Sequence, residues 1–154
     1  MPFDESLEEH RMAGVSLRHG MHNRVRLVAP AFANERCCVL GRWLYEDGAR
    51  GHDTPGLQQL KLAHASFHAI VLSIAISITQ GRLADAALML EPDALFESAA
   101  RRLAQALSRF EHDRMTGEPG RTLHTDGYID IEATRQSSCD SGSWQLMRTV
   151  SAEY

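Results

Sequence analysis

The apolar positions of this chain recur mostly at helical spacing. The clearest stripe follows Thr54, which is a good N-cap, and Pro55, which suits the first position of a helix. Its members are Leu57, Leu60, His64, Phe67, Val71, Ala75 and Ile78. Gly81 is a suitable C-terminal stop. These signals predict one long helix from Pro55 to about Gly81.

Two more helices are predicted on either side of the first. From about Phe3 to Val28 one face repeats at helical spacing, and Pro30 marks the predicted end of this helix. That face consists of His10, Gly14, Leu17, Met21 and Val25. The last helix is predicted to begin at Pro92 and to run to about Asp113. Its apolar face consists of Phe96, Ala99, Leu103, Ala106, Leu107 and Phe110.

The segments between these helices carry weaker signals. Arg82–Leu90 predicts a short extra helix, Ala29–Cys37 a connection, and Glu46–Asp53, rich in Gly and Asp, a loop. The apolar run Cys38–Tyr45 is too short to assign by periodicity alone. Together the elements predict an all-α fold, a small antiparallel four-helix bundle over residues 3–114.

The character of the chain changes over residues 115–154. Gly117, Pro119 and Gly120 break any helix, and the apolar residues that follow are scattered. This region also carries most of the net charge of −4. We therefore expect a flexible C-terminal tail, with at most a weak strand near Tyr128–Ile131.

Composition narrows the function classes. A length of 154 residues with 44% hydrophobic residues suits one globular domain. The mildly acidic charge argues against a nucleic-acid binder, and no run reaches the roughly 18 apolar residues of a membrane span. The first residues lack the apolar region of a secretory signal, and three cysteines are too few for a disulfide framework. We expect a cytoplasmic protein with no membrane span.

The first candidate chemistry is a histidine pair on the long predicted helix. His64 and His68 are four residues apart, so a helix places both on one face, where two imidazoles can hold one metal ion. The pair is not a metalloprotease motif, because Ala65 stands where the catalytic Glu would follow. Two buried histidines bonded to backbone or water are the alternative, and the spacing alone leaves both open.

A second candidate lies in the run from Cys38 to Leu44. A cysteine thiolate is a soft ligand that zinc favours. Gly41 permits a close backbone approach, and Trp43 is large enough to anchor the run to the core. The alternative is an inert buried cysteine, which is the common fate of a free thiol.

Taken together, the two runs resemble a known family. Cys-x-Leu-Gly-x-Trp-Leu at 38–44, followed by His-x-x-Phe-His at 64–68, is similar to the chemoreceptor zinc-binding (CZB) domain. The resemblance covers roughly Glu9 to Phe110. It implies a four-helix bundle and a bacterial cytoplasmic sensory module that is found with chemoreceptors and diguanylate cyclases. It also implies a zinc ion held by three histidines and one cysteine.

The same resemblance implies the ligand set. Cys38, His64 and His68 match three of the family's ligands, and the fourth is a histidine on the first helix. Three histidines compete for that place, namely His10, His19 and His22. His10 fits best, because the family pattern places the histidine upstream of the cysteine by a helix and a loop.

The implied function is signalling rather than catalysis. Four protein ligands form a closed zinc site with no open position for a substrate, so we expect no enzymatic activity. The expected inputs are zinc or an oxidant acting on Cys38, and the expected partners are a second copy of the chain and a chemoreceptor or diguanylate cyclase. The alternatives are a metal-free helical interaction protein and, with less support, a di-iron or oxygen-binding helical bundle.

Overall fold

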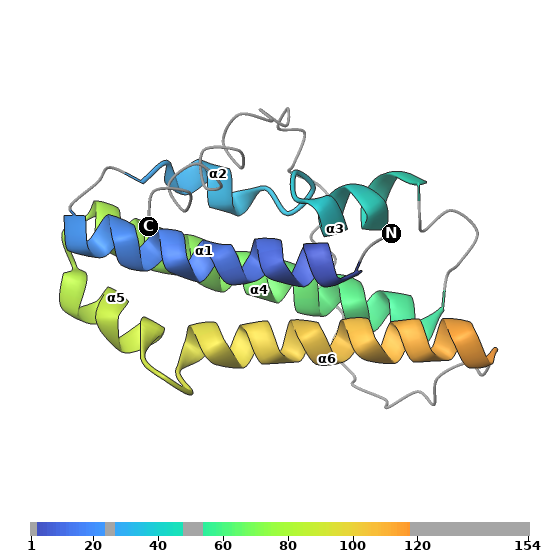
Figure 1. Ribbon diagram of the computed structural model, residues 1–154. Helices are drawn as coiled ribbons and strands as arrows, with labels where there is room; N and C mark the ends of the chain where they lie inside the picture. The colour runs from blue at the N-terminus through green and yellow to red at the C-terminus, as the bar shows by residue number, and fades with distance from the viewer. Residues whose placement is uncertain (1–2, 24–26, 48–53, 118–154) are drawn as a thin grey trace.

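A computed structural model describes residues 3–23, 27–47 and 54–117, and every regular element in these ranges is helical (Figure 1). The elements are α1 (Phe3–Asn23), α2 (Ala29–Ala33), α3 (Val39–Arg42), the π-helical turn η1 (Trp43–Asp47), α4 (Pro55–Thr79), α5 (Leu83–Leu90) and α6 (Leu95–Thr116). The predicted all-α fold class is confirmed. The weak strand predicted near Tyr128–Ile131 and most of the predicted tail lie outside the described residues.

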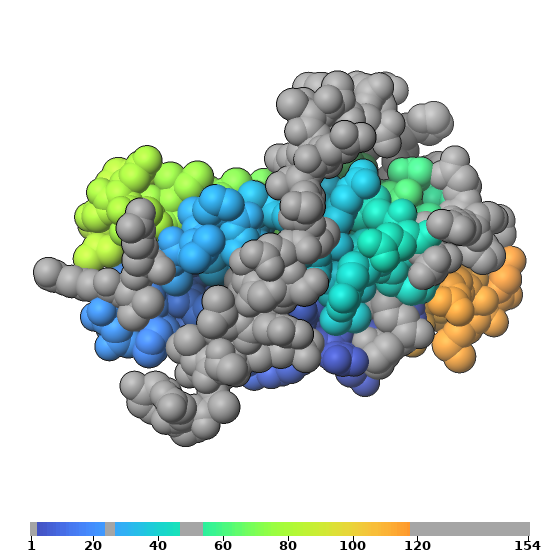
Figure 2. All heavy atoms as spheres, turned by 90° about the horizontal axis from the view of Figure 1, so that it is seen from above, coloured from blue at the N-terminus to red at the C-terminus, as the bar shows by residue number. Residues whose placement is uncertain are grey.

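Helix α4 is the centre of the bundle. It contacts α1, α2, α5 and α6, and Figure 1 shows the long helices α1 and α4 running one way and α6 running the other. Seen from above, α2 and α3 lie next to each other and form the surface on that side (Figure 2). By length and composition alone α4 is apolar enough to cross a membrane, with a mean hydropathy of 1.7. Its place in the middle of the core gives a sufficient reason for that apolarity.

The sequence signals around α4 act as predicted. The Thr54 hydroxyl accepts a hydrogen bond from Leu57 N at 3.2 Å, which caps the first turn. At the other end, Gly81 adopts a φ of +75°, a conformation that favours glycine. All seven residues of the predicted stripe are buried, so this helix is built as its pattern indicates.

The first helix is shorter than predicted, and the segment after it is not a plain connection. α1 ends at Asn23 rather than Val28, and Leu27 folds back onto α1. A Cβ at Gly20 would lie 2.7 Å from the Leu27 side chain, so the close approach of Leu27 requires that position 20 has no side chain. Pro30 then lies in the first turn of α2 instead of ending α1, because proline is well tolerated at that place in a helix.

The last helix is displaced at both ends relative to its prediction. It begins at Leu95 rather than Pro92, because Asp93 adopts a φ of 61°, which no right-handed helix accommodates. It ends at Thr116 rather than Asp113, where Gly117 in the left-handed conformation donates its N–H to the Asp113 carbonyl at 3.1 Å. Its predicted apolar face is correct: five of its residues are buried, and Ala106 packs against them.

Candidate metal centre

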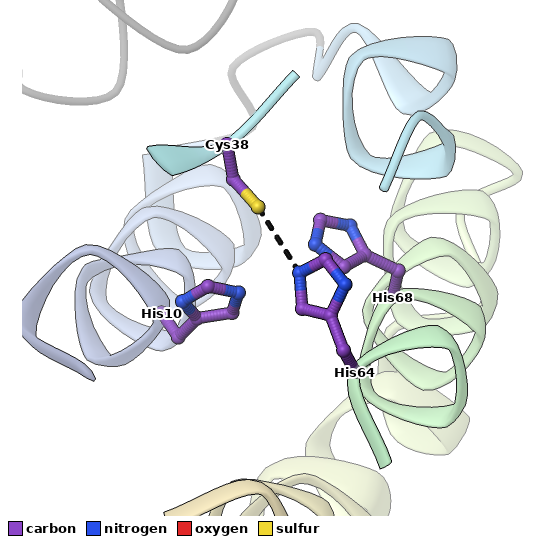
Figure 3. A group of neighbouring side chains, drawn as sticks. All are labelled: His10, Cys38, His64 and His68. Carbon is purple, nitrogen blue, oxygen red and sulfur yellow. Dashed lines mark hydrogen bonds between the residues drawn. The ribbon is translucent and has the colours of Figure 1, made fainter. Parts of the chain in front are cut away.

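The fold brings four metal-ligating side chains together in the core (Figure 3). His10 comes from α1, Cys38 from the start of α3, and His64 and His68 from α4. One nitrogen or sulfur atom of each residue lies within 4.8 Å of the corresponding atom of every other, and all four residues are buried. In the part of the chain that the structure describes, this is the one group of three or more potential ligands. These are the four residues predicted from the sequence.

Helix α4 presents half of the site on one face. His64 and His68 lie one turn apart with their ring centroids 4.6 Å from each other. Phe67, next to them on the same buried stripe, packs against the His10 ring with centroids 5.1 Å apart. Both histidines are therefore part of the core packing, and both face the other two ligands.

The structure selects His10 among the three histidines of α1. The His10 ring is 2% exposed, and its Nδ1 lies 2.6 Å from the carbonyl oxygen of Ser6. Because a carbonyl only accepts, Nδ1 carries the proton and Nε2 is the free ligand atom. His22 is exposed and bonds the Arg18 carbonyl, and His19 bonds Asn23. Neither belongs to the cluster.

His68 is oriented in the same way as His10, by a backbone carbonyl. Its Nδ1 donates to the carbonyl oxygen of Phe32 at 3.0 Å, which leaves Nε2 without a hydrogen-bond partner. Metal-binding histidines commonly donate their other ring N–H in this way, which fixes the tautomer and the ring orientation. Phe32 lies on α2, a helix that the sequence did not predict, so this role was missed. No sequence signal identifies a residue that acts through its backbone.

Cys38 is held at the N-cap of α3. Its Sγ accepts the Gly41 N–H at 3.1 Å and lies 3.0 Å from His64 Nε2. A Cβ on Gly41 would collide with the backbone oxygen of Glu35, so this close turn requires glycine. The Cys-x-x-Gly spacing is thus a capping turn that aims the sulfur inward.

The segment after Cys38 is anchored by aromatic packing. Trp43, at the start of η1, lies between Phe3 and Phe110, with ring centroids 6.1 Å and 5.6 Å away in edge-to-face contact. Single π-helical turns are rare and occur frequently at functional sites. The predicted anchoring role of Trp43 agrees with these contacts.

Burial sets the protonation of the four side chains. It lowers the pKa of His10, lowers that of His64 well below its ordinary value with help from the neighbouring His68 and His10, and lowers that of His68 to about 3. Burial also raises the pKa of Cys38 to about 12. Without a metal ion, the site at neutral pH holds three neutral imidazoles, which is the form that binds metals, and a thiol that must release its proton first.

The donor set fits a transition-metal ion. Two ring nitrogens that face the cluster, His10 Nε2 and His68 Nε2, have no hydrogen-bond partner among the described residues, whereas His64 faces Cys38 through its Nε2. Each such atom costs on the order of 1–3 kcal/mol unless something satisfies it. In a tetrahedral site with zinc bond lengths the donor atoms lie roughly 3.3–3.6 Å apart, so the cluster, at up to 4.8 Å, needs a contraction of about 1 Å. The cluster contains no carboxylate, which does not fit a di-iron site.

The remaining histidines and cysteines stay outside the cluster. His112 is exposed near the end of α6. Cys37 packs against the core beside Cys38, but it is disulfide-bonded and does not join the four ligands. His52, His124 and Cys139 lie outside the described residues.

Comparisons with known proteins found no match: no protein-family model, no curated protein and no solved structure matches this chain. The case for metal binding therefore rests on the geometry and chemistry of the four-residue cluster.

Proposed function

We propose that this protein is a zinc-binding sensory or regulatory module that passes a zinc or oxidant signal to a partner. One observation carries the zinc part of the proposal: three buried histidines and one buried cysteine meet with their ligand atoms within 4.8 Å of one another. Three neutral imidazoles and one thiolate form a donor set that zinc favours over magnesium or calcium.

Within this proposal the metal site is closed and the protein is not an enzyme. His10, Cys38, His64 and His68 would fill the four positions of a tetrahedral zinc ion, and the ion would act as a Lewis acid that joins three elements of the fold. No position would remain for a water or a substrate. The hydrogen bonds to the Ser6 and Phe32 carbonyls orient His10 and His68 toward that shared ion.

The direct test is the metal content of protein purified without a histidine tag. We expect one zinc per chain, and a Cys38→Ser variant that binds zinc far more weakly. His10→Ala should have the same effect, whereas His22→Ala, on the exposed side of the same helix, should bind zinc as the parent does. A parent protein with no metal would leave the alternative of a metal-free helical interaction protein, and a coloured iron-containing protein would favour the di-iron alternative.

The signalling part of the proposal is supported by the resemblance to the CZB family. By that resemblance the module would work in the cytoplasm, as a homodimer or with a chemoreceptor or a diguanylate cyclase. Light scattering at tens of micromolar tests self-association, and a purely monomeric species would count against the dimer. Co-purification with a receptor or cyclase encoded beside this protein would test the partner.

An oxidant would act on the sulfur of Cys38. Hypochlorous acid converts a thiolate to sulfenic acid and chloride, so the ligand loses its negative charge and the metal bond weakens. Because Cys38 is fully buried, the oxidant reaches it only when the Cys38–Leu44 run moves. The test follows zinc release with a chromogenic chelator during titration with hypochlorous acid. Oxidation of Cys139 before Cys38 with zinc still bound would contradict the redox role.

A further inference from the structure

A carboxylate beside the cluster links the two ligands that do not come from α4. Glu9 immediately precedes His10 on α1, and its Oε2 accepts the backbone N–H of Val39, the residue after Cys38, at 2.8 Å. The bond joins positions 30 residues apart in the chain. α1 and α3 are in contact at this point, so Glu9 fastens the segment that carries Cys38 to the helix that carries His10.

The hydrogen bond between Glu9 and Val39 lies at the N-terminus of α3, next to Cys38. Cys38 is the N-cap of α3, and the N–H groups at the start of that helix need acceptors. The Cys38 sulfur takes one of them, from Gly41, and Glu9 takes another, from Val39. The two bonds hold the backbone on either side of the sulfur, so a shift of Val39 would move Sγ relative to the three imidazoles.

The negative charge of Glu9 also favours a metal ion at the cluster. The side chains of the cluster are neutral before a metal binds, whereas a divalent cation with one thiolate carries a net charge of +1 in the core. A carboxylate in hydrogen-bond contact with the next residue offsets part of the cost of burying that charge.

We propose that Glu9 is a positioning residue of the metal centre, which holds Cys38 in ligating geometry through the N–H of Val39. This inference rests on the proposed zinc site, and it adds a fifth residue that does not itself bind the ion. Residues in such supporting roles typically change metal affinity by about 10- to 100-fold when they are substituted.

The experiment measures zinc affinity by competition with a chromogenic chelator. Glu9→Ala removes the acceptor and the charge, and we expect about a 10- to 100-fold loss. Glu9→Gln keeps an oxygen acceptor for the Val39 N–H and should lie between the parent and Glu9→Ala. Glu8→Ala is the matched control, because Glu8 is exposed and bonds Arg11 on the outer side of α1. Its zinc affinity should equal that of the parent.

A second arm tests whether Glu9 acts through Cys38. In a Cys38→Ala background the Val39 hydrogen bond no longer positions a ligand, so Glu9→Ala should cost clearly less affinity than it does in the parent. Amide exchange at Val39 should accelerate in Glu9→Ala and remain slow in Glu8→Ala. The proposal is overturned if Glu9→Ala binds zinc within about threefold of the parent, or if the loss is the same in both backgrounds. A parent that binds no zinc would instead overturn the proposed function.

Discussion

The two halves of the candidate metal centre are built in different ways. The α4 half sits on one continuous helix of 25 residues, and the spacing of four between His64 and His68 places them on the same face. The other half, called the Cys38 half, combines His10 on α1 with Cys38. The segment of Cys38 consists of two short elements, α3 with four residues and η1 with five, neither of which is long enough to be stable alone. Glu9, Gly41 and Trp43 hold this second half in place by contacts with distant parts of the chain.

This difference separates a rigid half from an adjustable half. A long, buried helix keeps its two imidazoles in fixed register, with or without an ion. A short segment held by a few tertiary contacts opens at a lower free-energy cost than a core helix does. A change in metal occupancy or in the Cys38 sulfur would therefore move the Cys38 half first.

The largest effect should come from removal of the rigid half. A double variant, His64→Ala with His68→Ala, loses two of four ligands and should lose roughly 4 kcal/mol or more of zinc binding, about a thousandfold in affinity. Alanine is a good helix former, so α4 should stay helical by circular dichroism. Ser66→Ala, on the exposed face between them, is the control and should bind zinc normally. Tight zinc binding by the double variant would mean that the ligands lie elsewhere.

The pH dependence of stability should separate the two halves in protein kept free of metal by a chelator. The histidines stay neutral in the folded state because their pKa values are lowered, so the unfolded chain takes up protons first as the pH falls below about 6.5. Stability is complete above that pH and falls by up to about 4 kcal/mol per pH unit for three such groups. His64→Ala with His68→Ala should remove most of this acid loss.

At alkaline pH, the change in folding stability is determined by Cys38. Its folded pKa of about 12 lies above the ordinary value near 9, so its contribution is complete below pH 9 and is lost as the pH rises toward 12. Urea unfolding across the pH range measures both limbs. In a Cys38→Ala variant, the free energy of unfolding should fall less steeply at alkaline pH and as steeply as in the parent at acid pH. An alkaline limb that is identical in the variant and the parent would show that other groups control it.

An intermediate loss of stability is expected from Gly41→Ala, which disrupts the turn that holds Cys38 in the adjustable half. The new Cβ would collide with the Glu35 backbone oxygen, and backbone cannot move aside as a flexible side chain can. We expect a loss of about 3 kcal/mol in stability and weaker zinc binding. Gly56→Ala is the matched control, because a Cβ there meets only the Asp113 carboxylate at 3.2 Å and the Phe110 ring at 3.8 Å. Equal stability of the two variants would mean that the Cys38 turn tolerates a side chain.

The smallest effect is expected at the start of α4. Thr54→Ala removes the cap on Leu57 N and should cost about 1 kcal/mol in thermal or urea unfolding. Zinc affinity should stay within about twofold, because the cap lies more than two turns before His64. Thr54→Ser keeps the oxygen and should restore the stability. A large drop in zinc affinity for Thr54→Ala would show that the α4 half is less rigid than its length indicates.

Sequence periodicity predicted the α4 half of the site almost completely. The stripe from Leu57 to Ile78 marks the buried face, and the cap at Thr54 and the stop at Gly81 mark the ends. Local hydrogen bonds and helical geometry decide these features, and both depend on residues a few positions apart. The same local reasoning was wrong at Pro30, which lies in the first turn of α2, and at Pro92, because Asp93 adopts a positive φ and α6 begins only at Leu95.

What the sequence by itself determined is therefore the all-α class, the long core helix and the pairing of His64 with His68. The family resemblance favoured His10 over His19 and His22, and the tertiary structure decided between them, because all three lie on one helix and only His10 is buried. It also decided the supporting contacts, because the Phe32 carbonyl and the Glu9 carboxylate act on residues 36 and 30 positions away. Periodicity describes one helix at a time, whereas a metal centre is formed where several helices meet.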